Sequence, residues 1–178
     1  MPRLFIAVDL PETNKKTLEA MFFGIPGARW VDPLQIHLTV RFIGDVDGAV
    51  FLDIKNALKE ISITPFDIQL KGVGHFPPRG APRVIWVGLD KNEALQILRK
   101  KIDTALLRIG LEPERRNFSP HITLARLKNT PIQKIADFLA GNSLFKQEHF
   151  QVEDFKLYSS TLTPKGAIHT VEEMYSLH

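Results

Sequence analysis

Two short segments share a pattern of residues that could do chemistry. "HLTV" begins at His37 and "HITL" begins at His121, so each has a histidine and a threonine separated by one apolar residue. Successive side chains of a β-strand point to opposite faces. In each segment the histidine and the threonine would therefore share one face, and the apolar residues would anchor the other. Imidazole exchanges protons near neutral pH, and a threonine hydroxyl can donate a hydrogen bond to an oxyanion.

Two such strands facing each other would suit a phosphodiester. One of His37 and His121 would take a proton from water, and the other would give a proton to the leaving oxygen. Thr39 and Thr123 would hold the non-bridging oxygens as negative charge builds on them. Since the imidazoles supply both proton transfers, we expect no metal or other cofactor. A lone His-x-Thr would more often be structural, but two copies with matching apolar flanks favour a catalytic pair.

The elements around the two motifs recur in the same order. Each motif strand is preceded by an apolar strand and a helix and is followed by a second helix. The expected helices are "PETNKKTLEAMFF", "GAVFLDIKNALKEI", "NEALQILRKKIDTALLRIG" and "PIQKIADFLAG". We predict one bilobal domain over residues 1–178, with repeats of approximately 1–65 and 81–140 and partly interleaved lobes. The expected class is α+β, with two antiparallel sheets facing a central cleft about a pseudo-twofold axis and helices on the outer faces.

Composition limits the class of protein and its setting. The chain has 178 residues, 44% of them hydrophobic, which is typical of a globular protein that buries a core. It has no cysteine, which excludes disulfides and thiolate metal sites and favours a cytoplasmic location. No apolar run reaches transmembrane length, so we expect no membrane partner. The net charge of +3 permits a polyanionic partner without requiring one.

The motifs and their flanking segments resemble a known family. The paired histidine motifs resemble those of the two-histidine phosphoesterases. The flanks resemble, more narrowly, those of the archaeal and bacterial RNA 2′,3′-cyclic phosphodiesterases, also called 2′-5′ RNA ligases. The similar segments are "RLFIAVDLP", "WVDPLQIHLTVRFIGD", "FPPRGAPRVIWVGL", "FSPHITLARLK" and "FKLYSSTLTPKGA". The resemblance implies cleavage of RNA 2′,3′-cyclic phosphate ends to 2′-phosphates. It also implies reversible joining of RNA ends, such as tRNA halves, through a 2′-5′ bond.

The resemblance also implies roles for single residues. His37 matches the family's proton donor and His121 its proton acceptor, while Thr39 and Thr123 match the hydroxyls that hold the phosphate. Phe42 matches an aromatic position that can stack on a nucleobase.

Strand alternation adds expectations for the neighbours of the motifs. In a regular strand Phe42 would lie on the face opposite His37, so it needs a bulge or the strand end to reach the cleft. Arg41 would share the face of His37 and could contact an RNA phosphate. Arg126 would point away from His121, which fits a structural ion pair at least as well as a phosphate contact. His169 stands where relatives often carry tyrosine, which leaves the local substrate contact open.

Two other functions stay open at this point. The same site could act as a phosphodiesterase on small cyclic nucleotides. The chain could also be an RNA-end-binding module without chemistry, although the presence of both histidines favours an enzyme.

Overall fold

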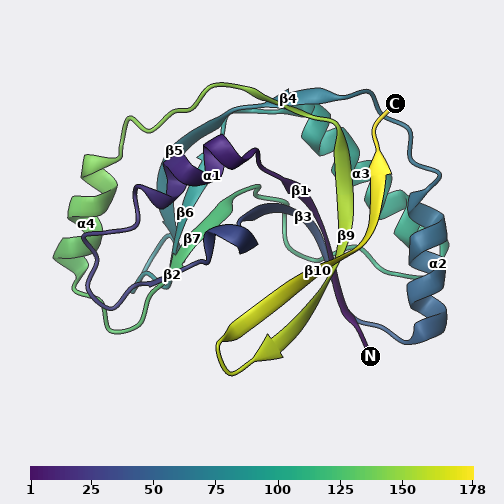
Figure 1. The fold of residues 1–178 in the computed structure, drawn as a ribbon, viewed down its shortest axis with the longest axis horizontal. Helices are drawn as coiled ribbons and strands as arrows, with labels where there is room; N and C mark the ends of the chain where they lie inside the picture. Colours follow the sequence, from purple (N-terminus) through teal and green to yellow (C-terminus); the bar gives the residue numbers. More distant parts are fainter.

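A computed structural model describes residues 1–178 and contains two four-stranded antiparallel sheets (Figure 1). The first sheet has the spatial order β10 (Gly166–Ser176), β9 (Asp154–Thr163), β1 (Arg3–Asp9) and β3 (His37–Asp45). The second has the order β2 (Arg29–Trp30), β7 (Ile122–Arg126), β6 (Val84–Leu89) and β5 (Leu70–Phe76). A small third sheet pairs β4 (Phe66–Ile68) with β8 (Phe150–Val152).

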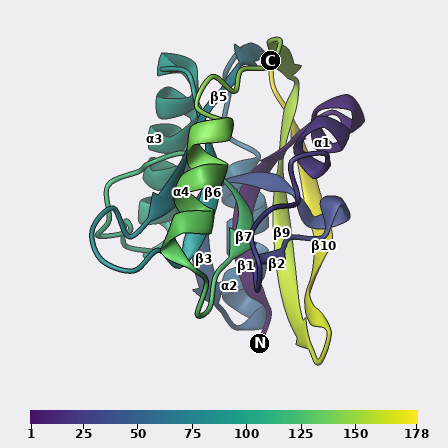
Figure 2. The same cartoon turned by 90° about the vertical axis from the view of Figure 1, so that its left-hand side faces the viewer.

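The helices lie on the outside of the sheets. They are α1 (Glu12–Glu19), α2 (Gly48–Leu58), α3 (Glu93–Arg108) and α4 (Ile132–Gly141), with a short 3-10 helix, η1 (Pro33–Gln35). Figures 1 and 2 show α4 beyond the second sheet, whereas α2 and α3 lie beyond the first. The helix α3 packs on α2 and on β3. The expected α+β class, with antiparallel sheets inside and helices outside, is confirmed.

The element order differs from the expected order only where short interruptions divide a segment. β1, α1, β3 and α2 are followed by β6, α3, β7 and α4, and each motif strand pairs antiparallel with the strand before it. Pro33 starts η1, which separates β2 from β3. Gln69 separates β4 from β5, and Glu153 separates β8 from β9. A duplication with repeats of about 1–65 and 81–140 stays a hypothesis.

One continuous core joins the two sheets. The apolar residues of both motifs belong to it: Leu38 and Val40 from β3, and Ile122 and Leu124 from β7, are each at most 1% exposed. Burying such side chains contributes roughly 1.5–3 kcal/mol each. The apolar face of each motif strand thus fixes its polar face toward the space between the sheets.

A β-bulge follows the threonine of each motif. On β3, Thr39 and Arg41 pair with the adjacent residues Ala7 and Ile6, so Val40 is the extra residue. On β7, Thr123 and Ala125 pair with the adjacent Trp86 and Ile85, so Leu124 is extra. An extra residue shifts strand alternation by one position beyond the bulge.

The bulges correct two of the expectations from regular alternation. Beyond Val40, Phe42 turns to the face of His37 and pairs with Phe5, whose ring stacks on His37. Arg41 was expected to share that face, which is wrong: it turns to the opposite side and is only 3% exposed. Arg126 was expected to point away from His121, and this is also wrong, since it turns to the cleft side.

Polar groups from α3 and the following loop hold the first bulge. Arg99 Nη1 donates to the carbonyl of the bulged Val40 at 2.6 Å. Glu114 Oε1 accepts from the backbone N–H of Phe42 at 2.9 Å and lies 3.6 Å from Arg99 Nη2. The irregular backbone thereby keeps its hydrogen bonds, as buried backbone requires.

Arg41 completes this network beneath the strand. Its Nη2 donates to the Glu112 carbonyl at 2.7 Å, and its Nε lies 3.4 Å from Asp103. Asp103 also accepts from Arg99 Nε at 2.9 Å. Arg41, which regular alternation would have allowed to contact an RNA phosphate, therefore forms structural ion pairs instead.

We expect Arg99→Met to destabilise the protein by about 2–3 kcal/mol. The change leaves the Val40 carbonyl without its donor and the two carboxylates with one cation fewer. Urea unfolding followed by circular dichroism measures the loss. Arg108→Met, at the exposed end of the same helix, is the control and should change stability by about 0.5 kcal/mol or less. Equal losses in the two variants would contradict the role of Arg99.

Candidate active site

Both histidine motifs line a single cavity between the sheets. His37 and Thr39 reach it from β3, and His121 and Thr123 reach it from the second sheet. Its volume is about 380 Å³. The rest of its wall comes from β1, β7, the η1 region and the β9–β10 hairpin, and includes Arg3, Phe5, Gln35, Phe42, Arg126, Ser160, Leu162 and His169. The structure therefore brings the four predicted motif residues together.

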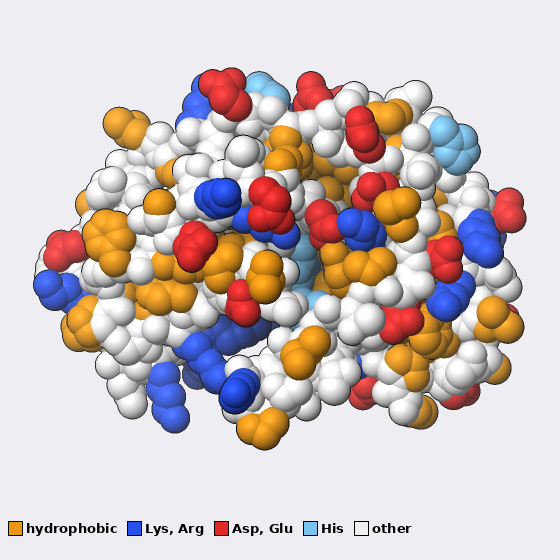
Figure 3. All heavy atoms as spheres, viewed as in Figure 1, with side chains coloured by type: hydrophobic (Ala, Val, Ile, Leu, Met, Phe, Trp, Pro, Cys, Tyr) orange, Lys and Arg blue, Asp and Glu red, His pale blue; other side chains and the backbone are white.

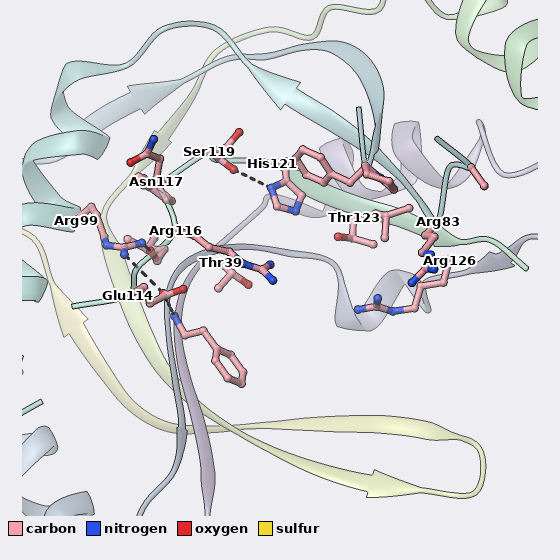
Figure 4. Close-up of a pocket in the computed structure, with 17 residues that line it drawn as sticks. Thr39, Arg83, Arg99, Glu114, Arg116, Asn117, Ser119, His121, Thr123 and Arg126 are labelled. Carbon is pink, nitrogen blue, oxygen red and sulfur yellow. Dashed lines mark hydrogen bonds and ion pairs between the residues drawn. The ribbon is translucent and has the colours of Figure 1, made fainter. Parts of the chain in front are cut away.

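A larger cavity of about 850 Å³ adjoins the first (Figure 4). The two share Thr39, Phe42, His121, Thr123 and Arg126, so these residues lie at the junction. Beyond the junction the larger cavity is lined by aromatic and basic side chains, which include Phe76, Phe118, Arg83 and Arg116. Figure 3 shows histidine deep in a hollow of the surface, with lysine and arginine side chains gathered on one side of it.

His37 lies in an aromatic, half-buried environment. Its ring stacks on Phe5 at a centroid distance of 4.9 Å and meets the ring of His169 edge-on, also at 4.9 Å. Burial, followed by the charge of His169, lowers the pKa of His37 to about 4, although a hydrogen bond to the Gln35 backbone acts in the opposite direction. The imidazole is therefore uncharged at neutral pH in the free protein.

His121 is oriented by a backbone carbonyl. Its Nδ1 lies 2.8 Å from the carbonyl oxygen of Ser119, and a carbonyl can only accept, so Nδ1 carries the hydrogen. The neutral ring then presents the lone pair of Nε2. Phe76 holds the ring edge-on at a centroid distance of 4.9 Å. Both histidines thus bond the backbone of the residue two positions earlier.

The rings of Phe5, Tyr158 and His169 form an aromatic wall behind His37, and Asp9 holds this wall in place. Asp9, at the end of β1, accepts hydrogen bonds from Lys156 and from the hydroxyl of Tyr158. Burial acts to raise the pKa of Asp9, but these two bonds hold it below its usual range. The ring of Tyr158 stacks on Phe5 at 5.2 Å, so the bond from its hydroxyl fixes the ring on which His37 rests.

Sequence reasoning missed this wall. Phe5 and Asp9 lie on the same face of "RLFIAVDL", the apolar strand that precedes the first motif, and neither was predicted as a site residue. The acidic residue at the end of an apolar strand was the available signal. Tyr158 lies on β9, whose pairing with β1 could not be deduced from local pattern, and His169, singled out from the family resemblance alone, lies on β10 next to β9.

The other predicted site residues lie as follows. Phe42 is 42% exposed at the junction of the two cavities, with the guanidinium of Arg3 5.4 Å from its ring centre. Arg126 lines both cavities, and Arg41 lines neither. Nowhere do three or more His, Cys, Asp or Glu side chains group in a way that could hold a metal ion. No helix is long and apolar enough to cross a membrane.

The chain is similar to known proteins along most of its length. A sequence model of the 2′-5′ RNA ligase superfamily matches residues 25–163. An RNA 2′,3′-cyclic phosphodiesterase of Methanocaldococcus jannaschii is 37% identical over 95% of this chain and 97% of its own length. One from Archaeoglobus fulgidus is 32% identical, over 94% and 96%. The crystal structure of TT0787 of Thermus thermophilus, 30% identical, superposes with a TM-score of 0.80 and covers 98% of this chain and 97% of its own.

These similarities identify the class of protein and the family within it. The chain belongs to the 2′-5′ RNA ligase superfamily of two-histidine phosphoesterases. Within that superfamily it belongs to the family of the RNA 2′,3′-cyclic phosphodiesterases, so the family resemblance of its motifs is confirmed.

We expect His37 to make the protein less stable in acid. In the unfolded chain His37 has an ordinary pKa near 6.5 and binds a proton below that pH. In the folded protein its pKa is about 4, so it stays unprotonated until the pH falls to that value. Stability should therefore rise with pH through this window, by about 2 kcal/mol between pH 4.5 and 7 for this group. Chemical unfolding across that range should show a flatter pH dependence for His37→Gln. His149→Gln, which removes an exposed histidine, should keep the slope of the unchanged protein. An unaltered slope in His37→Gln would refute the buried neutral histidine.

Proposed function

We propose that this chain hydrolyses 2′,3′-cyclic phosphate ends of RNA to 2′-phosphates, with His37 and His121 as the acid–base pair. The observation that carries the proposal is the cavity in which both histidines and both threonines meet. The names of the relatives, RNA 2′,3′-cyclic phosphodiesterases, support the substrate and the reaction.

The proposed step is an in-line displacement at phosphorus. His121 takes a proton from water as the water oxygen bonds to phosphorus. The bond from phosphorus to the 3′ oxygen breaks, and His37 gives that oxygen a proton. The product has a 3′-hydroxyl and a 2′-phosphate, and the protons balance once the two imidazoles exchange protons with solvent. Thr39 and Thr123 donate to the non-bridging oxygens, and Arg126 adds positive charge beside them.

The surroundings of the two imidazoles support these roles. The hydrogen bond to Ser119 leaves Nε2 of His121 free to accept a proton. His37 is uncharged in the free protein, so it must gain a proton before it can act as the acid. A phosphodiester anion beside the ring favours the charged form and supplies that shift. His37 therefore becomes the acid on binding the substrate.

The larger cavity favours RNA over a small cyclic nucleotide. His121 lines both cavities, whereas His37 lines only the smaller one, so the nucleophile enters from the larger cavity. Phe42 stands exposed at the junction, where its face can stack on a base of the RNA. Arg83 and Arg116 lie further along and can meet backbone phosphates.

The same geometry supports ligation as a second activity. If the 5′-hydroxyl of another RNA replaces water on the His121 side, the displacement forms a 2′-5′ bond instead of a 2′-phosphate. The large cavity on that side has room for a second RNA end, and tRNA halves are one such pair of ends. The joining is reversible because attack of the 3′-hydroxyl on the 2′-5′ bond retraces the step.

An RNA oligonucleotide that ends in a 2′,3′-cyclic phosphate tests the hydrolysis. We expect ³¹P NMR to show conversion to the 2′-phosphate at a rate that EDTA does not change. A 3′-phosphate product would overturn the assignment of the leaving oxygen. Loss of activity in EDTA would show that the two imidazoles do not suffice.

Variants of the four motif residues test their roles on the same substrate. We expect His37→Ala and His121→Ala each to lower kcat by about 10²- to 10⁴-fold, and Thr39→Ala and Thr123→Ala to lower it less. A substrate with sulfur in place of the 3′ oxygen has a better leaving group and needs less help from an acid. It should largely restore His37→Ala and leave His121→Ala impaired. Restoration of His121→Ala instead would show that the roles are reversed.

A further inference from the structure

His169 is a third histidine in the smaller cavity, and the proposed reaction gives it no task. It lies on β10 opposite Ser160. Its ring centre is 4.9 Å from the rings of both His37 and Phe5, and it meets both edge-on. Its Nδ1 is buried without a hydrogen-bond partner. The side chain is therefore placed against His37 itself and makes no polar contact through Nδ1 that would explain a histidine there.

Two imidazoles this close repel each other when both carry a positive charge. A unit charge about 5 Å away disfavours a second like charge by an amount that grows as water is excluded. The charged and titratable groups that face the pair from the neighbouring elements are Asp9 and Arg3 on β1, Lys15 on α1, Tyr158 on β9, and His121 and Arg126 from the second sheet. Most of these are cationic or neutral.

Asp9 is the carboxylate among these groups, and it is already engaged. It accepts from Lys156 and from Tyr158, so its negative charge is largely compensated. Asp9 still raises the pKa of His37, but less than burial and His169 lower it. A phosphate in the cavity would be the first uncompensated negative charge to reach it.

We propose that His169 is a positioning residue that adds to burial in keeping His37 uncharged until a phosphate anion occupies the smaller cavity. The proposal rests on the proposed function, in which His37 gives a proton to the leaving oxygen. Without a ligand, burial lowers the pKa of both rings, and a proton on His169 lowers the pKa of His37 further. The bound anion then allows His37 to take up the proton it will donate.

The side chain of His169 can be changed without breaking the link that holds β10 to the site. The hydrogen bond between His169 and the Oε1 of Gln35, at 3.2 Å, is donated by the backbone N–H. His169→Phe and His169→Tyr both keep a ring against Phe5 and His37 but cannot become cationic. The two variants therefore remove the charge while they keep the packing.

NMR spectra of the ¹⁵N-histidine-labelled protein test the proposal. The His37 signals are assigned by their loss in His37→Gln and are followed against pH, with and without inorganic sulfate, an anion whose charge is constant over this range. In the free protein we expect both variants at His169 to raise the pKa of His37 by roughly 0.6–1.6 pH units. This is the shift that a unit charge about 5 Å away produces at effective dielectric constants of about 80 to 30. His149→Phe should leave it unchanged.

Sulfate should raise the pKa of His37 in the unchanged protein and in both variants, with the smaller rise in the variants. A His37 titration that does not move in either variant would overturn the proposal. A shift in His169→Phe but not in His169→Tyr would also overturn it. Both variants remove the positive charge of His169, so an effect of that charge must appear in both.

Turnover separates this proposal from the proposed function. The limb of the kcat/KM profile that belongs to His37 should move to higher pH in both variants by the shift seen in the spectra. A limb that stays in place would remove His169 from the reaction while hydrolysis stands. If the unchanged protein does not hydrolyse the cyclic phosphate, the proposed function fails, and the titration of His37 still decides whether His169 keeps it uncharged.

Discussion

The extra residue that follows the threonine of each motif is the constraint on which the site depends. Each bulge adds one position to a strand, and each lets a side chain that regular alternation would turn away face the cleft. On β3 this side chain is Phe42, and on β7 it is Arg126. The first bulge is held by Arg99 and Glu114, which bond its carbonyl and the following amide. An ion-pair network at the wall of the larger cavity thus determines which side chains of β3 face the cleft.

The same network explains why the buried Arg41 lies on β3, the strand that carries His37 and Thr39. Two guanidinium groups and two carboxylates share the space under β3, and each guanidinium also donates to a backbone carbonyl. Buried ion pairs often fail to stabilise a protein relative to apolar residues. Here the groups satisfy backbone that a bulge would otherwise leave unpaired, and no apolar side chain could do that.

Local patterns in the sequence predicted the fold class and the four motif residues because these depend on periodicity. His37 and Thr39 share a face in any strand, and apolar neighbours at Leu38 and Val40 orient that face. What failed was extrapolation along the strand: Arg41 and Arg126 were placed by alternation, and a bulge is set by tertiary bonds that local sequence does not show. The packing of Phe5, Tyr158 and His169 around His37 was not predicted for a related reason, since it forms only when β9 pairs with β1 and β10.

The two halves of the cleft are alike in backbone and unlike in surroundings, and this difference suits the separate tasks that we propose for the two histidines. Each ring bonds the backbone two residues before it. His37, however, rests against an aromatic wall in the smaller cavity, whereas His121 stands where the two cavities join. A base that must activate water or an RNA hydroxyl needs the open side. An acid that must hold its proton for the leaving oxygen benefits from the more enclosed side, where an anionic substrate favours the charged imidazole.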